Sequence, residues 1–472
     1  MRRLLNIMLI KIKKFDYQRP SIILVVIGFF SAATFAQPGS SLREGDTNPP
    51  LTHHSLHVKI DPFAQTIEVD DLIKFSGGKS GTEKTFNLNA NLEITNRPRR
   101  LQKLVSEDSE RRSRLNAMSS NTATKNIYTL SLPRRRSDEL MLSYSGKISD
   151  VIVQFGNEYA QSFAETSGVI ASEGVYLNKN SAWVPDFGDE FITFELSIEF
   201  EGRAEDWLAI SQGDRSDRNA WVSHRPVEEI YLIAGAFIEY SHSDYDDAEQ
   251  DSIQKLAYLR TPDINLATRY LDATERYLAL YEPLLGDYPY SKFALVENFW
   301  ETGYGMPSFT LLGEKIIRFP FILESSYPHE ILHNWWGNGV YPDYETGNWS
   351  EGLTAYLADH LFQEMEGNGA KYRKEMLARY RNYVGEGVDF PLKDFTARNS
   401  AASQAIGYGK TLMLWHMLRK RLGDDLFLEG LRTFYADFLF KRASFADIAL
   451  HFSSISGEDL TSFFSQWVER VG

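Results

Sequence analysis

The sequence predicts two folded parts, an N-terminal antiparallel β domain followed by a mainly α domain. Three observations lead to this fold class. The chain has 472 residues, which is more than one ordinary domain contains. From about residue 51 to residue 240, apolar and polar residues alternate as they do in half-buried strands. After a polar, acidic segment at residues 241–251, the apolar residues recur at helical spacing.

The β domain, residues 37–240, is predicted from runs in which every second side chain is apolar. Leu56, Val58 and Ile60 alternate with polar residues, and residues 191–200 read FITFELSIEF. Such runs each bury one face of a strand, and many of them in one segment favour an antiparallel sheet.

Two basic stretches interrupt this pattern, at residues 97–114 and 134–136. Each carries or adjoins acidic side chains, and mixed charges of this kind are typical of solvated loops. An anionic ligand site is the alternative interpretation.

The second domain is predicted to occupy residues 252–472, with residues 241–251 as the linker before it. A helix is expected to begin at Thr261-Pro262-Asp263, because proline suits the first turn of a helix. Extended segments are expected near residues 293–296 and 310–319, and the remainder is expected to be mainly helical.

The N-terminus has the pattern of an export signal. A basic leader precedes residues 21–36, which read SIILVVIGFFSAATFA and end in the small-x-small sequence Thr34-Phe35-Ala36. We therefore predict a signal peptide at residues 1–36 and a periplasmic or secreted protein. The alternative is an uncleaved membrane anchor at residues 21–36, although this run is shorter than the roughly 20 residues of a typical span.

The composition excludes several kinds of site. The formal net charge of −14 argues against nucleic acid as a partner, because phosphate binding requires a basic surface. The chain has no cysteine, which removes disulfides, thiolate metal ligands and cysteine nucleophiles. Any metal ion must therefore be held by histidine and carboxylate side chains.

The strongest motif is His329-Glu330-Ile331-Leu332-His333, which matches HExxH. Two histidines four residues apart lie on one face of a helix, so both imidazoles can reach one ion. Glu330 projects beside that ion, where it can accept a proton from bound water. Tyr327-Pro328 provides a helix start just before the motif.

A third ligand is expected from Glu351, near the start of a helix running from about Asn348 to Met365. Two histidines and a glutamate form a known catalytic zinc set with one position left open for water. The alternative is that Glu351 only interacts favourably with the helix N-terminus. We expect one Zn²⁺ per chain.

At these residues the chain resembles the aminopeptidase N family of gluzincin metallopeptidases. That family has HExxH, then 18 intervening residues, then a glutamate in a WxxEG-like context. Here the likeness lies in HEILHNWWGN and WSEGLTAYLA, with residues 334–350 as 17 intervening residues. A one-residue deletion between Val340 and Asn348 accounts for the difference. The resemblance implies a thermolysin-like (gluzincin) catalytic domain.

Further segments resemble the same family. Tyr408-Gly409-Lys410 is similar to its YxKG segment, which implies that Tyr408 donates a hydrogen bond to the developing oxyanion. The alternative for Tyr408 is a half-buried packing aromatic. The likeness extends over about residues 51–472 without the family's large C-terminal helical domain. Its other segments are residues 172–177, 183–185, 286–292 and 463–467.

One departure concerns the family's GxMEN motif, whose glutamate binds the free α-amine of the substrate. The matching strand reads Gly303-Tyr304-Gly305-Met306 and continues with Pro307-Ser308. Proline carries no charge and cannot pair with an ammonium group. We expect this strand to bind substrate through its backbone. Glu173 is taken as a substrate-binding candidate, with Glu297 and Glu301 as further substitutes for the lost anchor.

The function expected from these residues is zinc-dependent hydrolysis of peptide or protein substrates, with Glu330 as general base. An aminopeptidase with a relocated amine anchor is the first alternative. A catalytically idle peptide-binding protein of the same fold is the second, and a lipid or epoxide hydrolase is a third. Contact with a membrane is expected only if the N-terminal segment stays uncleaved.

Overall fold

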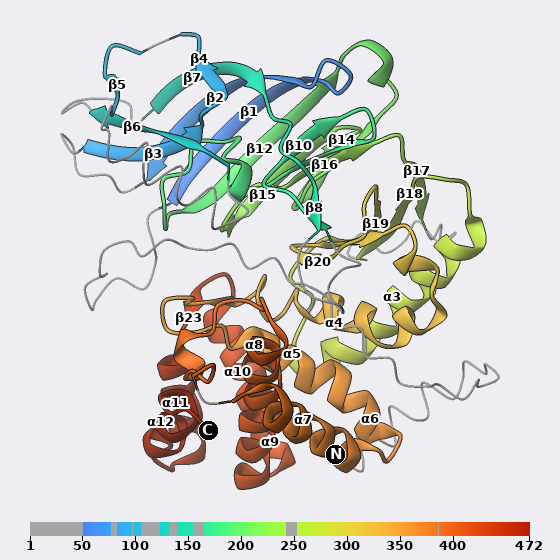
Figure 1. Ribbon diagram of the computed structural model, residues 1–472, viewed down its shortest axis with the longest axis vertical. Coiled ribbons are helices and arrows are strands. Elements are labelled where there is room, and N and C mark those ends of the chain that lie inside the picture. The colour runs from blue at the N-terminus through green and yellow to red at the C-terminus, as the bar shows by residue number, and fades with distance from the viewer. Residues whose placement is uncertain are drawn as a thin grey trace.

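The computed structural model describes residues 51–76, 83–96, 98–104, 123–131, 139–154, 164–241, 253–385 and 387–472. In Figure 1 the strands of the N-terminal part lie above the helices of the C-terminal part. The predicted signal peptide lies outside the described residues, as do residues 134–136 and most of residues 97–114.

A seven-stranded sheet forms the largest layer of the N-terminal part within the described ranges. Its strands pair antiparallel except for β1 and β12, which are parallel along their whole length. The sheet therefore departs from the purely antiparallel expectation at one pair. In spatial order its strands are β14 (Asp214–Asp217), β15 (Ala220–Val227), β12 (Phe191–Phe200), β1 (Leu51–Asp61), β2 (Thr66–Ser76), β7 (Glu139–Lys147) and β4 (Leu92–Ile94).

The alternation expected in β1 is observed, because Leu56, Val58 and Ile60 are all buried. Smaller sheets complete this part, and the side chains of Trp183 and Trp221 lie in the shared apolar core. The four-stranded sheet has the order β10 (Val169–Ala171), β11 (Gly174–Leu177), β16 (Leu232–Gly235) and β13 (Leu208–Ile210). The three-stranded sheet has the order β3 (Glu83–Asn89), β6 (Lys125–Ser131) and β5 (Leu101–Lys103), and β8 (Val153–Gln154) pairs with β9 (Ala164–Glu165).

A five-stranded sheet opens the C-terminal part. Its spatial order is β17 (Ile238–Ser241), β18 (Gln254–Leu259), β19 (Lys292–Asn298), β21 (Phe309–Gly313) and β20 (Gly303–Met306). Strand β20 lies at the edge and pairs antiparallel with β21. β17 and β18 also pair with each other, so the strands flanking the predicted linker belong to one sheet. Apart from Ser241, the linker itself lies outside the described residues.

Helices make up most of the C-terminal part outside this sheet. The first, α3 (Ile264–Leu285), begins where the sequence predicted, and its N-cap Asp263 accepts a hydrogen bond from the Leu266 N–H at 2.9 Å. The prediction of an extended segment at residues 310–319 was partly wrong, because the strand ends at Gly313 and the 3-10 helix η3 (Ile316–Arg318) follows it.

The remaining helices follow along the chain, and the first of them carries the HExxH segment. They are α4 (Ser326–Leu332), α5 (Ser350–Ala355), α6 (Leu361–Met365), α7 (Gly369–Tyr383), α8 (Ala401–Gln404), α9 (Thr411–Leu422), α10 (Asp424–Phe438), α11 (Phe445–Ser456) and α12 (Thr461–Val468). Two π-helical segments, η5 (Tyr356–His360) and η7 (Ala405–Lys410), continue α5 and α8. In the part of the chain that the structure describes, no separate large helical domain follows them.

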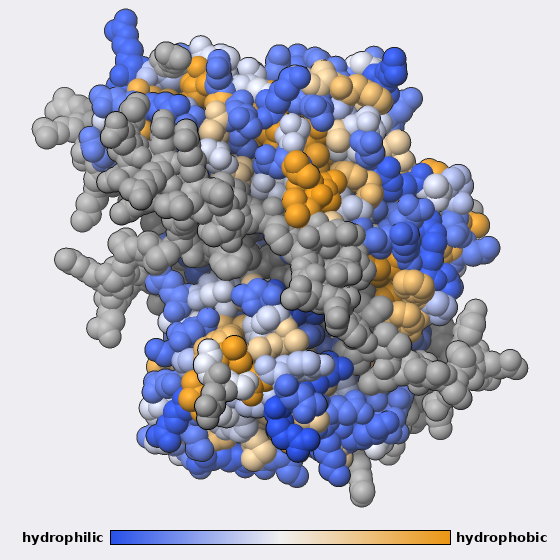
Figure 2. Space-filling model, viewed as in Figure 1, coloured by the Kyte–Doolittle hydropathy of each residue, from blue (hydrophilic) through white to orange (hydrophobic). Residues whose placement is uncertain are grey.

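Strand β20 and helices α4 and α5 meet where the sheets and the helices adjoin (Figure 1). On the face shown in Figure 2, hydrophilic side chains cover most of the coloured surface and apolar ones gather in separate patches. None of the described helices has the length and apolar character that crossing a membrane requires.

Candidate active site

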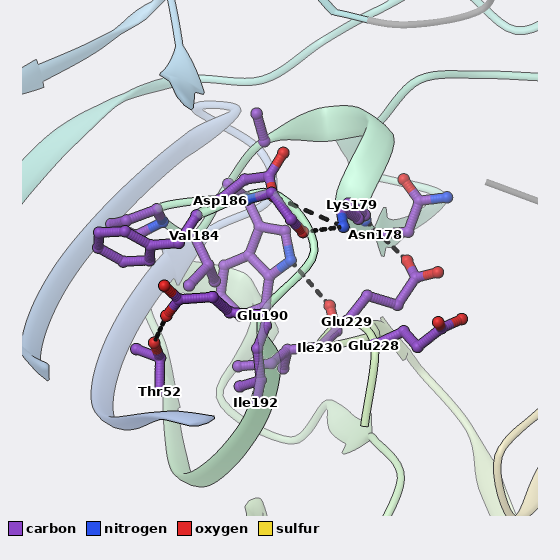
Figure 3. Close-up of a pocket in the computed structure, with 15 residues that line it drawn as sticks. Thr52, Asn178, Lys179, Val184, Asp186, Glu190, Ile192, Glu228, Glu229 and Ile230 are labelled. Atoms are coloured by element: carbon purple, nitrogen blue, oxygen red, sulfur yellow. Dashed lines mark hydrogen bonds and ion pairs between the residues drawn. The ribbon is translucent and has the colours of Figure 1, made fainter. Parts of the chain in front are cut away.

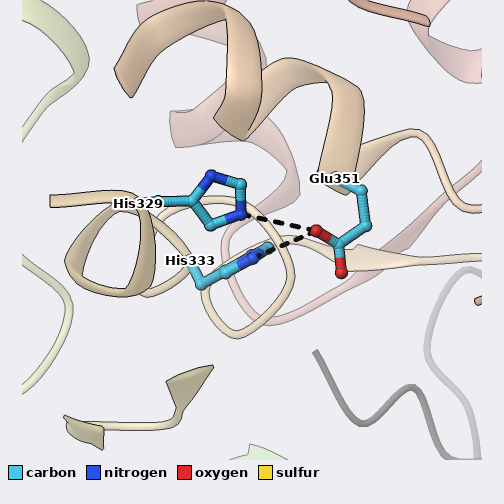
Figure 4. A group of neighbouring side chains, drawn as sticks. All are labelled: His329, His333 and Glu351. Atoms are coloured by element: carbon cyan, nitrogen blue, oxygen red, sulfur yellow. Dashed lines mark ion pairs between the residues drawn. The ribbon is translucent and has the colours of Figure 1, made fainter. Parts of the chain in front are cut away.

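His329, His333 and Glu351 converge on one point between α4 and α5 (Figure 4). One ligand atom from each lies within 4.8 Å of the other two. Nε2 of His329 is 3.5 Å from Oε2 of Glu351, and Nε2 of His333 is 3.4 Å from the same oxygen. All three side chains are buried.

Local sequence explains how α4 presents the two histidines. His333 lies at the C-cap but keeps helical torsion angles, with φ −57° and ψ −18°, so the i,i+4 relation to His329 is preserved. Ile331 and Leu332 are fully buried and hold the opposite side of the helix in the apolar core. The helix ends at Leu332, and turns come after it.

The segment between the ligands is anchored before it delivers Glu351. Strand β22 (Tyr341–Pro342) pairs with β23 (Arg442–Ala443), and the Asn348 N–H donates to the Phe395 carbonyl at 2.7 Å. Gly347 has φ +110°, and a Cβ there would lie 2.5 Å from the Leu392 carbonyl oxygen. Only glycine fits this turn, which starts α5 so that Glu351 falls in its first turn.

Two hydrogen-bond acceptors contact the Nδ1 atoms of the histidines, on the side of each ring away from Nε2. Oδ2 of Asp359 lies 3.1 Å from Nδ1 of His329, and the Trp336 carbonyl lies 3.0 Å from Nδ1 of His333. Such partners fix the ring orientation and leave Nε2 for the ion. Asp359 was missed from the sequence, because it reaches His329 only through the π-helical segment η5.

The donor set fits a divalent cation. Nε2 of His333 and Oε2 of Glu351 are buried and have no hydrogen-bond partner among the described residues. Buried polar atoms are rarely left unpaired. Two imidazoles and one carboxylate match the ligand preference of zinc. Despite the opposing effect of burial, the positive charge of His333 lowers the pKa of Glu351 and keeps it ionised.

Glu330 lies beside this cluster with 1% of its side chain exposed. Its Oε2 also lacks a hydrogen-bond partner within the described part of the chain. Burial raises the pKa of Glu330 to about 7, and the charges of His329 and His333 oppose the shift. The side chain can therefore exchange a proton near neutral pH.

Tyr408 approaches the same cluster from η7. Its ring stacks on that of His329, with centroids 6.3 Å apart and planes 12° apart, and packs edge-on against Phe395 at 6.2 Å. Burial and then the negative charge of Glu351 raise the pKa of Tyr408 well above its usual value. The phenol is therefore a proton-bearing hydrogen-bond donor at neutral pH.

The predicted substrate strand, Gly303 to Met306, is the edge strand β20. A Cβ added to Gly305 would lie 2.5 Å from Oε2 of Glu330, so the backbone of this strand runs directly beside the predicted base. Tyr304 and Met306 point the other way into an apolar cluster, where Tyr304 stacks on Tyr176 at 6.1 Å. Of this segment, the structure brings the glycine backbone and not the larger side chains to the site.

Two of the three carboxylates considered as amine anchors are already bonded to other groups. Glu297 pairs with Arg318 at 2.7 Å and accepts the Arg260 N–H at 2.6 Å. Glu301 accepts the Lys315 N–H at 3.0 Å. Glu173 is exposed in the turn between β10 and β11.

A small pocket lies in the β domain, away from the metal ligands (Figure 3). Its polar groups bond to one another: the Lys179 N–H donates to Glu229 at 2.8 Å, and the Lys179 ammonium lies 3.6 Å from Asp186. Thr52 donates to Glu190 in the same way. These bonds assign the pocket to the packing of the β domain.

Comparison with known proteins finds a family model that matches a segment of the C-terminal part. Residues 324–467 match the Peptidase family M1 domain. The chain is 20% identical over 382 residues to aminopeptidase N of Lactococcus lactis subsp. lactis, covering 73% of this chain and 44% of that protein. It is 25% identical over 205 residues to the alanine/arginine aminopeptidase of Saccharomyces cerevisiae, covering 39% and 24%. The chain thus spans less than half the length of these relatives.

Solved structures share the fold over nearly the whole chain. The M1 zinc metallopeptidase from Deinococcus radiodurans superposes with a TM-score of 0.61 at 15% identity, covering 90% of this chain and 94% of that one. A two-domain M1 zinc metallopeptidase variant bound to L-arginine gives 0.63 at 14% identity, covering 90% and 94%. At these identities the likeness establishes the fold, which consists of an N-terminal sheet region and a helical C-terminal part.

Proposed function

We propose that this chain, a divergent zinc metallopeptidase of the aminopeptidase N-like gluzincins, hydrolyses peptide bonds with Glu330 as the general base. The observation that carries the proposal is the buried cluster of His329, His333 and Glu351 with the unpartnered carboxylate of Glu330 beside it. The thermolysin-like description of the catalytic domain belongs to the same proposal. It is supported by an HExxH helix whose third ligand comes from the next helix.

The metal would be held by the two imidazoles and the Glu351 carboxylate, with Asp359 fixing the orientation of His329. Zinc, when bound, acts as a Lewis acid and lowers the pKa of water to about 7. Burial of the whole set strengthens its electrostatic interactions, because water does not screen them.

Glu330 performs the proton transfers. Its carboxylate accepts a proton from the attacking water and passes it to the departing amine, so no covalent intermediate with the protein forms. Seclusion from solvent favours this role, because burial raises the pKa of Glu330 and so helps the carboxyl group to hold the proton between the two transfers. Tyr408 stabilises the oxyanion that develops on the scissile carbonyl by donating its hydroxyl proton in a hydrogen bond.

The substrate is aligned by β20. An edge strand presents outward N–H and C=O groups that can pair with an extended peptide, and here the outward Gly305 carbonyl also accepts the Asn338 side-chain N–H at 3.3 Å. Because Pro307 provides no charge, this alignment does not require a free α-amine, and peptides with blocked N-termini are accepted as well.

The second candidate is an aminopeptidase whose amine anchor has moved. The aminopeptidase names of the relatives favour it, and the exposed Glu173 stays a candidate for the anchor. A catalytically idle peptide-binding protein is the third candidate, and the completeness of the catalytic set argues against it.

Paired peptides distinguish these candidates. The purified protein, loaded with zinc, is incubated with each peptide in free and N-acetylated form, and the products are identified by mass spectrometry beside a Glu330→Gln control. Internal cuts in both forms support the proposal. Loss of N-terminal residues from free peptides alone identifies an aminopeptidase. If neither form is cut, or if Glu330→Gln is fully active, the proposed mechanism is refuted.

Export to the periplasm or the medium is also proposed, on the basic leader and the apolar run at residues 21–36. N-terminal sequencing of the protein recovered from cell fractions tests it. A mature chain that starts at residue 37 supports a cleaved signal. A membrane-bound chain with its original N-terminus supports the anchor instead.

A further inference from the structure

The turn between β20 and β21 has an unusual conformation at Ser308. This residue has φ +68°, a left-handed value that favours glycine or asparagine, and it is fully buried. In the preceding position Pro307 has its φ set by its ring. A left-handed serine persists only where its surroundings hold it. Besides the Ala294 N–H, which donates to the Ser308 carbonyl at 3.1 Å, two side chains bond to Ser308 and help to hold this turn.

The first of these groups is Asn334, the residue directly after the predicted ligand His333. Its Oδ1 accepts the Ser308 N–H at 2.7 Å and the Tyr288 hydroxyl at 3.3 Å. Its Nδ2 donates to the Ile331 carbonyl at 3.0 Å. The Asn334 side chain is fully buried. One amide group thus joins the turn after β20 to the end of the HExxH helix.

The second group is Lys292, at the start of β19. Its Nζ donates to the Ser308 hydroxyl at 2.5 Å and lies 4.8 Å from the centre of the Trp221 ring. The side chain is 1% exposed. Burial lowers the pKa of Lys292 to about 7, against the opposing charge of Asp214. Because Trp221 belongs to β15, this lysine also connects the turn to the β domain.

These bonds act on the strand that passes the predicted base. Gly305 lies three residues before Ser308, and its backbone leaves too little room for a methyl group beside Glu330. A substrate paired with β20 would move with the strand, so a displacement of β20 changes the distance from the scissile bond to Glu330. A displacement of about 1 Å can cost on the order of 100-fold in rate. Pro307 offers no charge that could correct the register.

We propose that Asn334 is a positioning residue that holds the substrate-binding strand β20 at a fixed distance from the HExxH helix, with Lys292 supporting it through Ser308. This inference rests on the proposed function for its effect on catalysis. The bonds of Asn334 and Lys292 to Ser308, which we call the clamp, belong to the fold and can be studied without a substrate.

The test uses the full chain with Asn334→Ala, the milder Ser308→Ala, and Tyr435→Phe as a matched control. Tyr435 also contributes one hydrogen bond, from its hydroxyl to the Asp287 carbonyl at 2.9 Å, but it lies on α10. Zinc content, amide exchange by mass spectrometry, and kcat and KM for a short and a long peptide are measured for each.

We expect Asn334→Ala to keep one zinc per chain and to exchange the amides of residues 303–309 faster, with α3 unchanged. Its kcat/KM should fall about tenfold or more, mainly for the long peptide, because that peptide pairs with more of β20. Ser308→Ala should shift the same quantities less, and Tyr435→Phe should shift none of them.

Unchanged exchange at residues 303–309 in both clamp variants would overturn the inference. So would equal losses for the short and the long peptide, because a general structural defect predicts that result. If the wild-type protein cleaves no peptide, the proposed function fails, and the exchange data alone decide whether the clamp exists.

Discussion

Replacing Gly305 by alanine tests how closely β20 approaches the predicted base. The new Cβ would lie 2.5 Å from Oε2 of Glu330, whereas ordinary van der Waals contact begins at 3.4 Å. The carboxylate, as the end of a flexible side chain, would have to turn away by about 0.9 Å. Because misplacement by about 1 Å can cost on the order of 100-fold, we expect kcat/KM to fall by roughly that factor.

The fold and the metal site should survive this change. The same Cβ would lie 3.2 Å from Cδ2 of His333, which requires a shift of only a few tenths of an ångström. We therefore expect wild-type zinc content and a thermal midpoint within a few degrees of wild type. The assay is kcat/KM on a zinc-loaded protein, with metal content and melting temperature measured on the same sample.

Gly409→Ala is the matched control. It adds the same methyl group next to Tyr408, but the nearest atom is Cβ of Met376 at 3.9 Å, so activity should be kept. If Gly305→Ala has wild-type kcat/KM with zinc bound, β20 does not lie against the base in the active protein. Equal losses in both variants would also refute the steric explanation.

Three further predictions concern single side chains. Asp359→Ala removes the acceptor behind His329, so zinc affinity should fall about 10–100-fold in competition with a chelator, and unchanged affinity would contradict this role. Tyr408→Phe should lower kcat by roughly 100-fold or more while zinc stays bound, because it removes one donor to the oxyanion, whereas an unaltered kcat would leave Tyr408 a packing residue. Burial lowers the pKa of Lys292 from 10.5 to about 7, so between these values the unfolded chain binds the additional proton. The free energy of unfolding of wild type, relative to Lys292→Met, should therefore rise from about pH 7 to pH 10, by up to about 4 kcal/mol in urea denaturation, and a flat difference would mean an ordinary lysine pKa.

The predicted metal ligands could be found in the sequence because two of them depend on one helical turn. The i,i+4 spacing of His329 and His333 survives in α4, even though the helix ends before His333. Glu351 was less certain from spacing, since a helix-start glutamate has an ordinary capping role. The family resemblance pointed to it, and the structure brings its carboxylate within 3.5 Å of both imidazoles.

Which face of β20 meets the HExxH helix could not be predicted from its sequence. A strand with the sequence GYGM has one face with glycines and one with large side chains, and either face could have met the HExxH helix. Packing decides this: Tyr304 and Met306 fill the apolar layer beneath the β domain, so the glycines are left to face α4. We therefore expect only the backbone of Tyr304 and Met306, and not their buried side chains, to be available to a substrate.

Asn334 and Asp359 escaped sequence analysis for different reasons. Asn334 acts through Ser308, which is 26 residues away and meets it only in the folded chain. Asp359 comes eight residues after Glu351, and at about 100° per residue a regular α-helix would turn it some 80° away from the face of Glu351. The expected helix to about Met365 is present, but its middle is the π-helical segment η5.

The π-helical segment explains how the site keeps its geometry although two spacings are irregular. A π turn contains one more residue than an α turn. Asp359, the eighth residue after Glu351, therefore lies near the position that the seventh residue would have in a regular α-helix. The segment between His333 and Glu351 is one residue shorter than the family pattern, and it contains a glycine turn at Gly347 shortly before the helix that carries Glu351. Each irregularity lies between residues that act on the metal site, and in each case the backbone adjusts while the side chains still converge. Spacing alone therefore underestimates how complete this site is, because the ligands converge despite the shorter segment and the π-helical segment.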